Sequence, residues 1–158
     1  MKRAPLTKRG EEKLRTELKR LKTEDRPRVI QAIAEARSHG DLSENAEYAA
    51  AREQQSFIEG RIKEVEASLS NSEIIDVTSI TITDRVVFGA TVELESEDGA
   101  TKVVYQIVGD AEADIKQGLI SVSSPIARAM VGKSEGDAVD VAAPGGVRSY
   151  EIVAIRYE

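Results

Sequence analysis

The hydrophobic pattern of the first forty residues predicts one long, interrupted helix. Thr7 is a suitable N-cap, and Gly40 is a suitable C-terminal stop. Between them Pro27 removes a helical hydrogen bond, so we expect a kink or short break near residues 25–27. The apolar positions recur at steps of three and four, as on one face of a helix. They are Leu14, Leu18, Leu21, Ile30, Ile33 and Ala34.

A second helix is expected from residues 41–43 to about Ser70. Both helices combine a narrow apolar stripe with a wide charged face, which is typical of a coiled coil. Because the turn between them is short, the helices must form an antiparallel hairpin, about 40 Å long at ~1.5 Å per residue. Small residues beside the turn, including Ala49 and Ala51, allow close approach. The expected apolar stripe is Ala46, Ala50, Phe57, Ile58, Ile62, Val65 and Leu69.

After residues 70–72 the apolar period changes to the alternation of β-strands. A short helix is expected over residues 126–131, with Pro125 at its first position. The chain is therefore predicted to be α+β, with an antiparallel coiled-coil domain (residues 1–76) followed by a small β-sheet domain with a short helix (residues 80–158). Turns are expected at residues 97–99 and 144–146, and strands at 74–77, 85–88, 90–95, 101–108, 119–122, 138–141 and 150–157.

Composition narrows the classes of function. The chain has no cysteine and one histidine, which argues against a disulfide framework, a thiolate metal site and a Ser-His-Asp triad. No apolar run could span a membrane and no signal peptide is visible, so a cytoplasmic protein is expected. Residues 1–80 hold 15 basic and 15 acidic side chains, whereas residues 81–158 hold 7 and 13. This balance argues against a broad basic face for free nucleic acid, and the shift suggests a boundary near residue 80.

Asp41 and Glu44 lie at the turn of the hairpin, and the residues alone leave two interpretations open. Their spacing fits a capping box with Asp41 as the N-cap of the second helix. The same spacing lets two carboxylates share a divalent cation, although Mg²⁺ prefers an octahedral shell of oxygens. In the second case the turn binds metal weakly by itself, and it matters only inside a site that already holds metal.

Basic and polar residues flank these acids. Arg37 and Arg52 either form hairpin salt bridges, with Glu47 or Glu53, or contact phosphate. Close to the turn, His39 is expected to close the first helix, and Asn45 and Tyr48 are expected to serve as turn and packing residues.

In the second half, Ser123, Ser124 and Pro125 form a loop-to-helix turn that can also be a docking edge. Ser124 has no histidine partner in the sequence, which argues against a nucleophile. Residues 144–146 lack the following helix and lysine of a phosphate-binding loop.

The run IAEARSHGDLSENAEY at residues 33–48, followed by AREQQ at 51–55, resembles the bacterial transcript-cleavage factors of the Gre family, of the GreA type. The resemblance continues in EGRI at 59–62, VFGATV at 87–92, IVG at 107–109 and ISVSSPIA at 120–127. It therefore covers nearly the whole chain in order.

The resemblance implies a transcription elongation factor whose coiled coil enters the secondary channel of RNA polymerase, while an FKBP-like second domain docks at the channel mouth. It implies that the factor stimulates cleavage of the RNA 3′ segment in backtracked complexes, rather than being a free-standing nuclease. We expect it to act as a monomer when bound, without a membrane partner.

By the same resemblance, Asp41 and Glu44 are the catalytic acids, which donate their carboxylates in trans and complete a Mg²⁺ site shared with the polymerase. Arg37 and Arg52 face the RNA 3′ end. The polymerase-docking loop consists of Ser123, Ser124 and Pro125.

Three other functions fit the residues less well. A channel-binding inhibitor of the same fold is disfavoured by the intact pair of acids. A prolyl isomerase or chaperone needs an aromatic-lined pocket, and residues 81–158 offer only Phe88, Tyr105, Tyr150 and Tyr157. A generic coiled-coil adaptor leaves the acidic motif at the turn unexplained.

Overall fold

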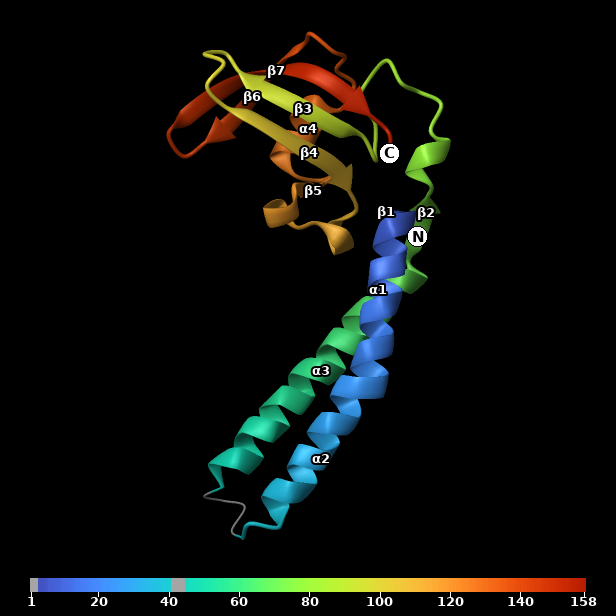
Figure 1. Cartoon of the computed structure of the whole chain (residues 1–158), viewed down its shortest axis with the longest axis vertical. Coiled ribbons are helices and arrows are strands. Elements are labelled where there is room, and N and C mark those ends of the chain that lie inside the picture. The colour runs from blue at the N-terminus through green and yellow to red at the C-terminus, as the bar shows by residue number, and fades with distance from the viewer. Residues whose placement is uncertain (1–2, 41–44) are drawn as a thin grey trace. The chain divides into compact units, whose positions relative to one another are not determined.

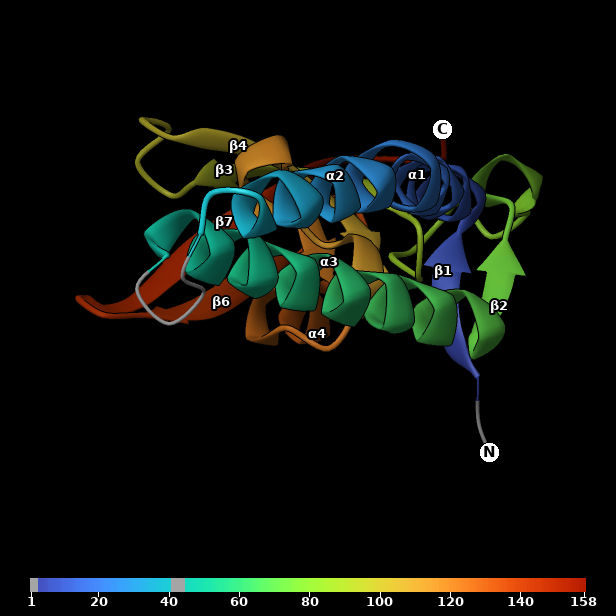
Figure 2. The same cartoon turned by 90° about the horizontal axis from the view of Figure 1, so that it is seen from below.

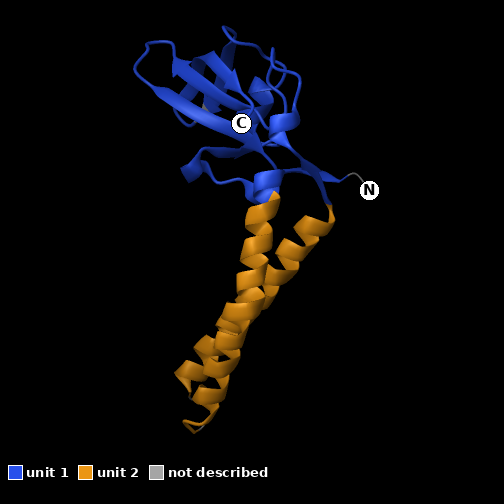
Figure 3. Ribbon diagram, turned by 45° about the vertical axis from the view of Figure 1, so that its right-hand side comes forward, with its two compact units in different colours: residues 1–10, 72–158 blue, residues 11–71 orange. Residues whose placement is uncertain are grey.

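The computed structural model describes residues 3–40 and 45–158 of the chain (Figure 1). The chain divides into two compact units, which are coloured separately in Figure 3. Residues 11–71 form the helical unit, and residues 1–10 together with 72–158 form the sheet unit. The sheet unit thus includes the start of the chain, whereas the domains predicted from the sequence divide it in order at residues 76–80.

The helical unit is the expected antiparallel hairpin. Its first arm consists of α1 (Lys8–Arg20, of which residues 8–10 count with the sheet unit), the π-helix η1 (Leu21–Asp25) and α2 (Arg26–Arg37). Its second arm is α3 (Ala46–Ser70), which runs beside α2 in both Figure 1 and Figure 2. The irregular turn that Pro27 predicts is this π-helix, directly before α2, with the proline in the first turn of α2.

The buried face of the hairpin differs by one residue from the predicted stripe at several positions. Val29 is 2% exposed while the predicted Ile30 is 52% exposed, and Ala51 is buried while the predicted Ala50 is exposed. Phe57, also predicted to be buried, is 75% exposed. The π-helix adds one residue to a turn, so the step between the buried Leu21 and Val29 is eight residues rather than a heptad. The hairpin core contains Leu18, Leu21, Val29, Ile58 and Ile62.

Ion pairs join the two arms around this π-helix. The Arg26 guanidinium donates two hydrogen bonds of 2.8 Å to the Glu59 carboxylate. On the other side of the π-helix, Arg61 donates two bonds of 2.7 Å to Glu17. A bidentate ion pair fixes the relative orientation of its two side chains as well as attracting them. These two pairs therefore hold the arms of the hairpin in register.

The sheet unit begins with a strand that the sequence did not predict. β1 (Ala4–Thr7) pairs in parallel with β2 (Ser72–Ile75), and Figure 2 shows both arrows pointing the same way. The expectation that Thr7 caps the first helix is confirmed, because its hydroxyl accepts a 3.0 Å hydrogen bond from the Gly10 amide.

The main sheet has five strands in the order β5-β4-β3-β7-β6. The pairs β3–β4, β3–β7 and β6–β7 are antiparallel, and β4–β5 is parallel. The helix α4 (Pro125–Met130) buries Ala127 and Met130 against one face of this sheet, where the core lies. The strands are β3 (Thr91–Ser96), β4 (Lys102–Val108), β5 (Leu119–Ser121), β6 (Ala138–Ala143) and β7 (Gly146–Arg156).

Short 3₁₀ turns connect several strands. They are η2 (Val77–Ser79), η3 (Asp110–Glu112) and η4 (Ile115–Gln117). The α+β class is confirmed, with a helical hairpin and a β-sheet unit. Within the described part of the chain, no helix has the length and apolar character needed to cross a membrane.

The strand predicted at residues 85–88 is wrong. This segment is irregular, although Val86 is fully buried in the core of the sheet unit. The Val86 amide donates to the Lys133 oxygen at 2.7 Å, and its own oxygen accepts from the Gly132 amide at 2.8 Å. The apolar residues are therefore explained by burial beside a loop, not by pairing with a strand.

Candidate functional site

The hairpin tip, defined as residues 36–52, carries the acidic motif found in the sequence. The predicted catalytic and metal-binding residues Asp41 and Glu44 lie outside the described residues, so their roles stay predictions. Among residues 3–40 and 45–158, no cluster of three or more His, Asp or Glu side chains could hold a metal ion. A carboxylate pair supplies the hard oxygen ligands that Mg²⁺ prefers, so the two acids fit this ion by their chemistry.

Asn45 is the N-cap of α3, so the first of the two interpretations, a capping box with Asp41 as the N-cap of this helix, is wrong. The Asn45 side-chain oxygen accepts a 3.0 Å hydrogen bond from the Tyr48 amide. Its side-chain nitrogen donates at 2.6 Å to the main-chain oxygen of Ala36 on α2. One side chain therefore starts α3 and also ties the two arms together at the tip.

The sequence did contain a signal for this cap. Asparagine is among the strongest N-cap residues, and Asn45 stands directly before Ala46, with a run of helix-forming alanines following at residues 49–51. The Asp-x-x-Glu spacing four residues earlier offered a competing start. The choice between them depends on where the backbone leaves the turn, which local spacing does not determine.

Arg37 and Arg52 are both exposed on the tip. The Arg37 guanidinium lies 5.8 Å from the centroid of the Tyr48 ring, within the range of a cation–π contact. Arg52 donates a 3.1 Å hydrogen bond to the side-chain oxygen of Gln55. Among the described residues neither arginine pairs with Glu47 or Glu53, the partners expected if they were hairpin salt bridges.

Glu47 contacts His39 instead. The His39 Nδ1 and Glu47 Oε2 atoms are 3.0 Å apart, and both side chains are mostly exposed. The backbone amide of His39 donates to the Ala36 oxygen at 3.2 Å, so His39 does help to close α2, as expected. The described part of the tip thus presents two guanidinium groups that no carboxylate neutralises there.

The predicted docking loop, Ser123–Pro125, joins β5 to α4 as expected. Ser124 is the N-cap of α4, and its hydroxyl accepts from the Ala127 amide at 3.3 Å. Pro125 occupies the first turn of that helix. Ser123 and Pro125 are exposed, while Ser124 is half-buried.

Sequence reasoning missed the residue that holds this loop. The Asp110 carboxylate accepts hydrogen bonds from the hydroxyls of Ser121 and Ser123, the latter at 2.8 Å. These bonds hold the pKa of Asp110 below its usual range. Eleven residues separate Asp110 from Ser121, so no spacing rule for turns would have paired them.

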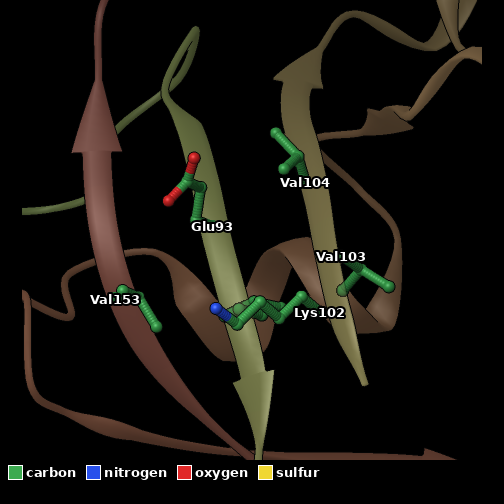
Figure 4. A pocket seen from close by; sticks show the side chains of 6 residues that line it. Glu93, Lys102, Val103, Val104 and Val153 are labelled. Carbon is green, nitrogen blue, oxygen red and sulfur yellow. The ribbon is translucent and has the colours of Figure 1, made fainter. Parts of the chain in front are cut away.

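A shallow pocket of about 240 Å³ lies on the outer face of the main sheet (Figure 4). Figure 4 shows the Lys102 side chain extending from β4 across β3. The lining is aliphatic and charged, with no aromatic side chain, while Phe88, Tyr105, Tyr150 and Tyr157 pack against the core. This disfavours a prolyl isomerase, and none of the predicted site residues lines the pocket. Its lining residues are Glu93, Leu94, Lys102, Val103, Val104 and Val153.

Comparison with protein families gives two matches. A model described as "Transcription elongation factor, N-terminal" matches residues 4–74. A second model, "Transcription elongation factor, GreA/GreB, C-term", matches residues 81–157. Together they span almost the whole chain.

Individual relatives agree with the family models. The chain is 68% identical over 158 residues to a protein of Halorhodospira halophila named transcription elongation factor GreA, with 100% of both chains covered. It is 66% identical over 157 residues to a protein of the same name from Alkalilimnicola ehrlichii, with 99% of both covered.

Solved structures of similar proteins were also found. GreA factor homolog 1 of Thermus thermophilus is 29% identical with a TM-score of 0.45, over 98% of this chain and 99% of that chain. A structure described as a prokaryotic transcription elongation factor GreA/GreB from Nitrosomonas europaea is 22% identical with a TM-score of 0.44, over the same shares.

Proposed function

Because the chain belongs to the GreA/GreB family of transcription elongation factors, we propose that it binds RNA polymerase and stimulates cleavage of the RNA 3′ segment in backtracked elongation complexes. In this proposal the hairpin enters the secondary channel of the polymerase, and the sheet unit docks at its mouth. The factor contributes groups in trans to a reaction of the polymerase and is not a nuclease by itself.

The observation that carries this proposal is the cap of α3. Asn45 satisfies the start of the helix, so Asp41 is not needed as its N-cap. The capping interpretation of the Asp-x-x-Glu spacing therefore fails, which favours the other interpretation, in which the two carboxylates share a divalent cation. A pair of acids that supplies only part of a Mg²⁺ shell is best explained by a partner that completes the site.

Each residue of the tip has a distinct task in the proposed mechanism. Asp41 and Glu44 would hold a Mg²⁺ ion shared with the polymerase and would orient the attacking water. When bound, the ion supplies Lewis-acid stabilisation of the phosphate and lowers the pKa of a bound water. Arg37 and Arg52 contact RNA phosphates, for which their guanidinium groups are free of carboxylate partners in the described structure. Asn45 holds the two arms together at the tip.

A backtracked elongation complex with RNA labelled at its 5′ end tests the proposal. We expect the full-length protein to shorten the RNA from its 3′ end at a rate well above that of the polymerase alone. A protein that binds the complex and slows elongation without shortening the RNA would instead be a channel-binding inhibitor. A protein that does not bind the polymerase at all would overturn the proposal.

A further inference from the structure

A single side chain outside the predicted site accepts hydrogen bonds from Ser123 of the docking loop and from Ser121 just before it. Asp110 lies in η3, directly after β4, and its Oδ1 atom accepts from both Ser121 and Ser123. The Ser121 hydroxyl also accepts a 3.1 Å hydrogen bond from the Ser123 amide. Asp110, Ser121 and Ser123 therefore form a closed set of hydrogen bonds around the first residue of the loop.

We propose that Asp110 is the positioning residue of the polymerase-docking loop, which it holds in its binding conformation through the hydroxyls of Ser121 and Ser123. This inference rests on the proposed function, in which Ser123–Pro125 docks on RNA polymerase. Hydrogen bonds to a carboxylate are stronger than those between neutral groups. A loop that is already ordered loses less conformational entropy on binding, so Asp110 raises the affinity without touching the polymerase.

The far end of the loop is fixed independently of Asp110. The Ser124 hydroxyl donates to the Ser121 oxygen at 2.7 Å and caps α4, and Pro125 restricts the backbone that follows. Loss of Asp110 therefore frees Ser123 in particular, while α4 keeps its cap. The expected defect is a local one in docking, not unfolding of the helix.

The turn that carries Asp110 is itself anchored on its other side. The Glu112 carboxylate accepts from the amides of Thr7 and Gly109, at 2.7 and 3.1 Å, and from the Thr7 hydroxyl. Gly109 packs so closely on β1 that an added Cβ would lie 2.2 Å from the Pro5 oxygen. The Asp110 backbone is thus held in place, as a residue that positions a loop requires.

Titration of the full-length protein into a backtracked elongation complex tests this role. We expect Asp110→Ala to raise the concentration for half-maximal cleavage about tenfold, as when one charge-assisted hydrogen bond is lost, and to leave the maximal rate unchanged. Asp110→Asn keeps an acceptor oxygen and should lie between Asp110→Ala and wild type. The matched control is Asp98→Ala, because Asp98 accepts a 2.6 Å bond from the Ser96 hydroxyl in a turn of the same sheet, away from the loop. The control should reach half-maximal cleavage at the same concentration as wild type.

A double mutant separates positioning from direct contact. If Asp110 acts through the loop, Ser121→Ala should reproduce part of the defect and add nothing to Asp110→Ala. The inference would be overturned if Asp110→Ala reached half-maximal cleavage at the same concentration as Asp98→Ala. It would also be overturned if the double mutant required a concentration raised by the product of the two single-mutant factors. Should Asp110→Ala melt below the assay temperature, Ser121→Ala alone decides: a smaller rise in the half-maximal concentration supports the inference, and a value equal to that of Asp98→Ala overturns it.

A direct binding measurement distinguishes failure of this inference from failure of the proposed function. Affinity of each fluorescently labelled protein for the polymerase is measured without cleavage. If wild type binds but does not stimulate cleavage, the cleavage proposal fails, and the Asp110 inference is still judged by its weaker binding. If wild type does not bind, both fail.

Discussion

The side-chain amide of Asn45 donates to the main-chain oxygen of Ala36 at 2.6 Å and so joins the start of α3 to the end of α2. Its oxygen at the same time caps α3 through the Tyr48 amide. The two tasks use different atoms of one side chain, so conservative substitutions can separate them.

Replacing Asn45 tests both bonds. Asn45→Ala should lower the free energy of unfolding of the hairpin by about 1–2 kcal/mol, because a helix loses its N-cap. Asn45→Asp keeps the capping oxygen but loses the donor to Ala36, so it should be less destabilised than Asn45→Ala. Urea unfolding followed by far-UV circular dichroism measures both. Equal stability of Asn45→Ala and wild type would show that the cap contributes nothing.

Asp41→Asn and Glu44→Gln should each remove most of the cleavage stimulation and leave polymerase affinity close to that of wild type. The amides keep the shape of the side chains but are poor ligands for Mg²⁺. The control is Glu64→Gln, an exposed acid on α3 far from the tip, which should cleave normally. A double variant that cleaves as well as wild type would remove the metal-ligand role.

Arg37→Ala and Arg52→Ala should weaken crosslinking to the RNA 3′ end and raise the factor concentration that cleavage requires. Their effect should shrink as salt rises, because ions already screen contacts between exposed charges. The maximal rate should fall much less than for Asp41→Asn. If Arg52→Ala abolishes cleavage at saturation with RNA contact intact, this arginine stabilises the transition state directly.

Three glycine-to-alanine substitutions should change the stability of the protein in different directions. Gly109→Ala should destabilise the sheet unit, because its Cβ would meet the Pro5 backbone oxygen at 2.2 Å. Gly10→Ala should destabilise less, because its Cβ would meet the end of the Glu112 side chain, at 2.3 Å, rather than backbone, although that carboxylate must then strain its hydrogen bonds to Thr7 and Gly109. Gly60→Ala should stabilise α3 by about 0.5–1 kcal/mol, because nothing lies within 4 Å and alanine favours helix. Thermal unfolding curves rank all three, and a stabilised Gly109→Ala protein would contradict the packing.

The hairpin should lose stability in acid through Glu17. Its hydrogen bonds to Arg61 hold the pKa of Glu17 below its ordinary value in the folded state. The stabilisation is therefore complete above the ordinary pKa of 4.5 and is lost as the pH falls from there through the lowered value. Glu17→Gln should flatten this part of the pH profile of unfolding. A profile identical to that of wild type would show that the pair does not contribute.

The sequence by itself determined the features that depend on neighbouring residues. The helical hairpin, the break before Pro27, the cap at Thr7 and the start of α4 at Ser124–Pro125 all follow from local periodicity and capping chemistry. The motif around Asp41 and Glu44 is likewise read from the residues alone.

The tertiary structure decided what depends on partners distant in the chain. β1 is a strand only because β2, beginning at Ser72, lies beside it, and Val86 is buried without a strand because it bonds to residues 132–133. The π-helix moved the buried position to Val29, which a regular period cannot anticipate. Asp110 meets Ser121 and Ser123 because β4 and β5 pair in parallel and bring their ends to the same edge of the sheet. Contacts of this kind require the whole fold, whereas a helix period or a cap needs only the next four residues.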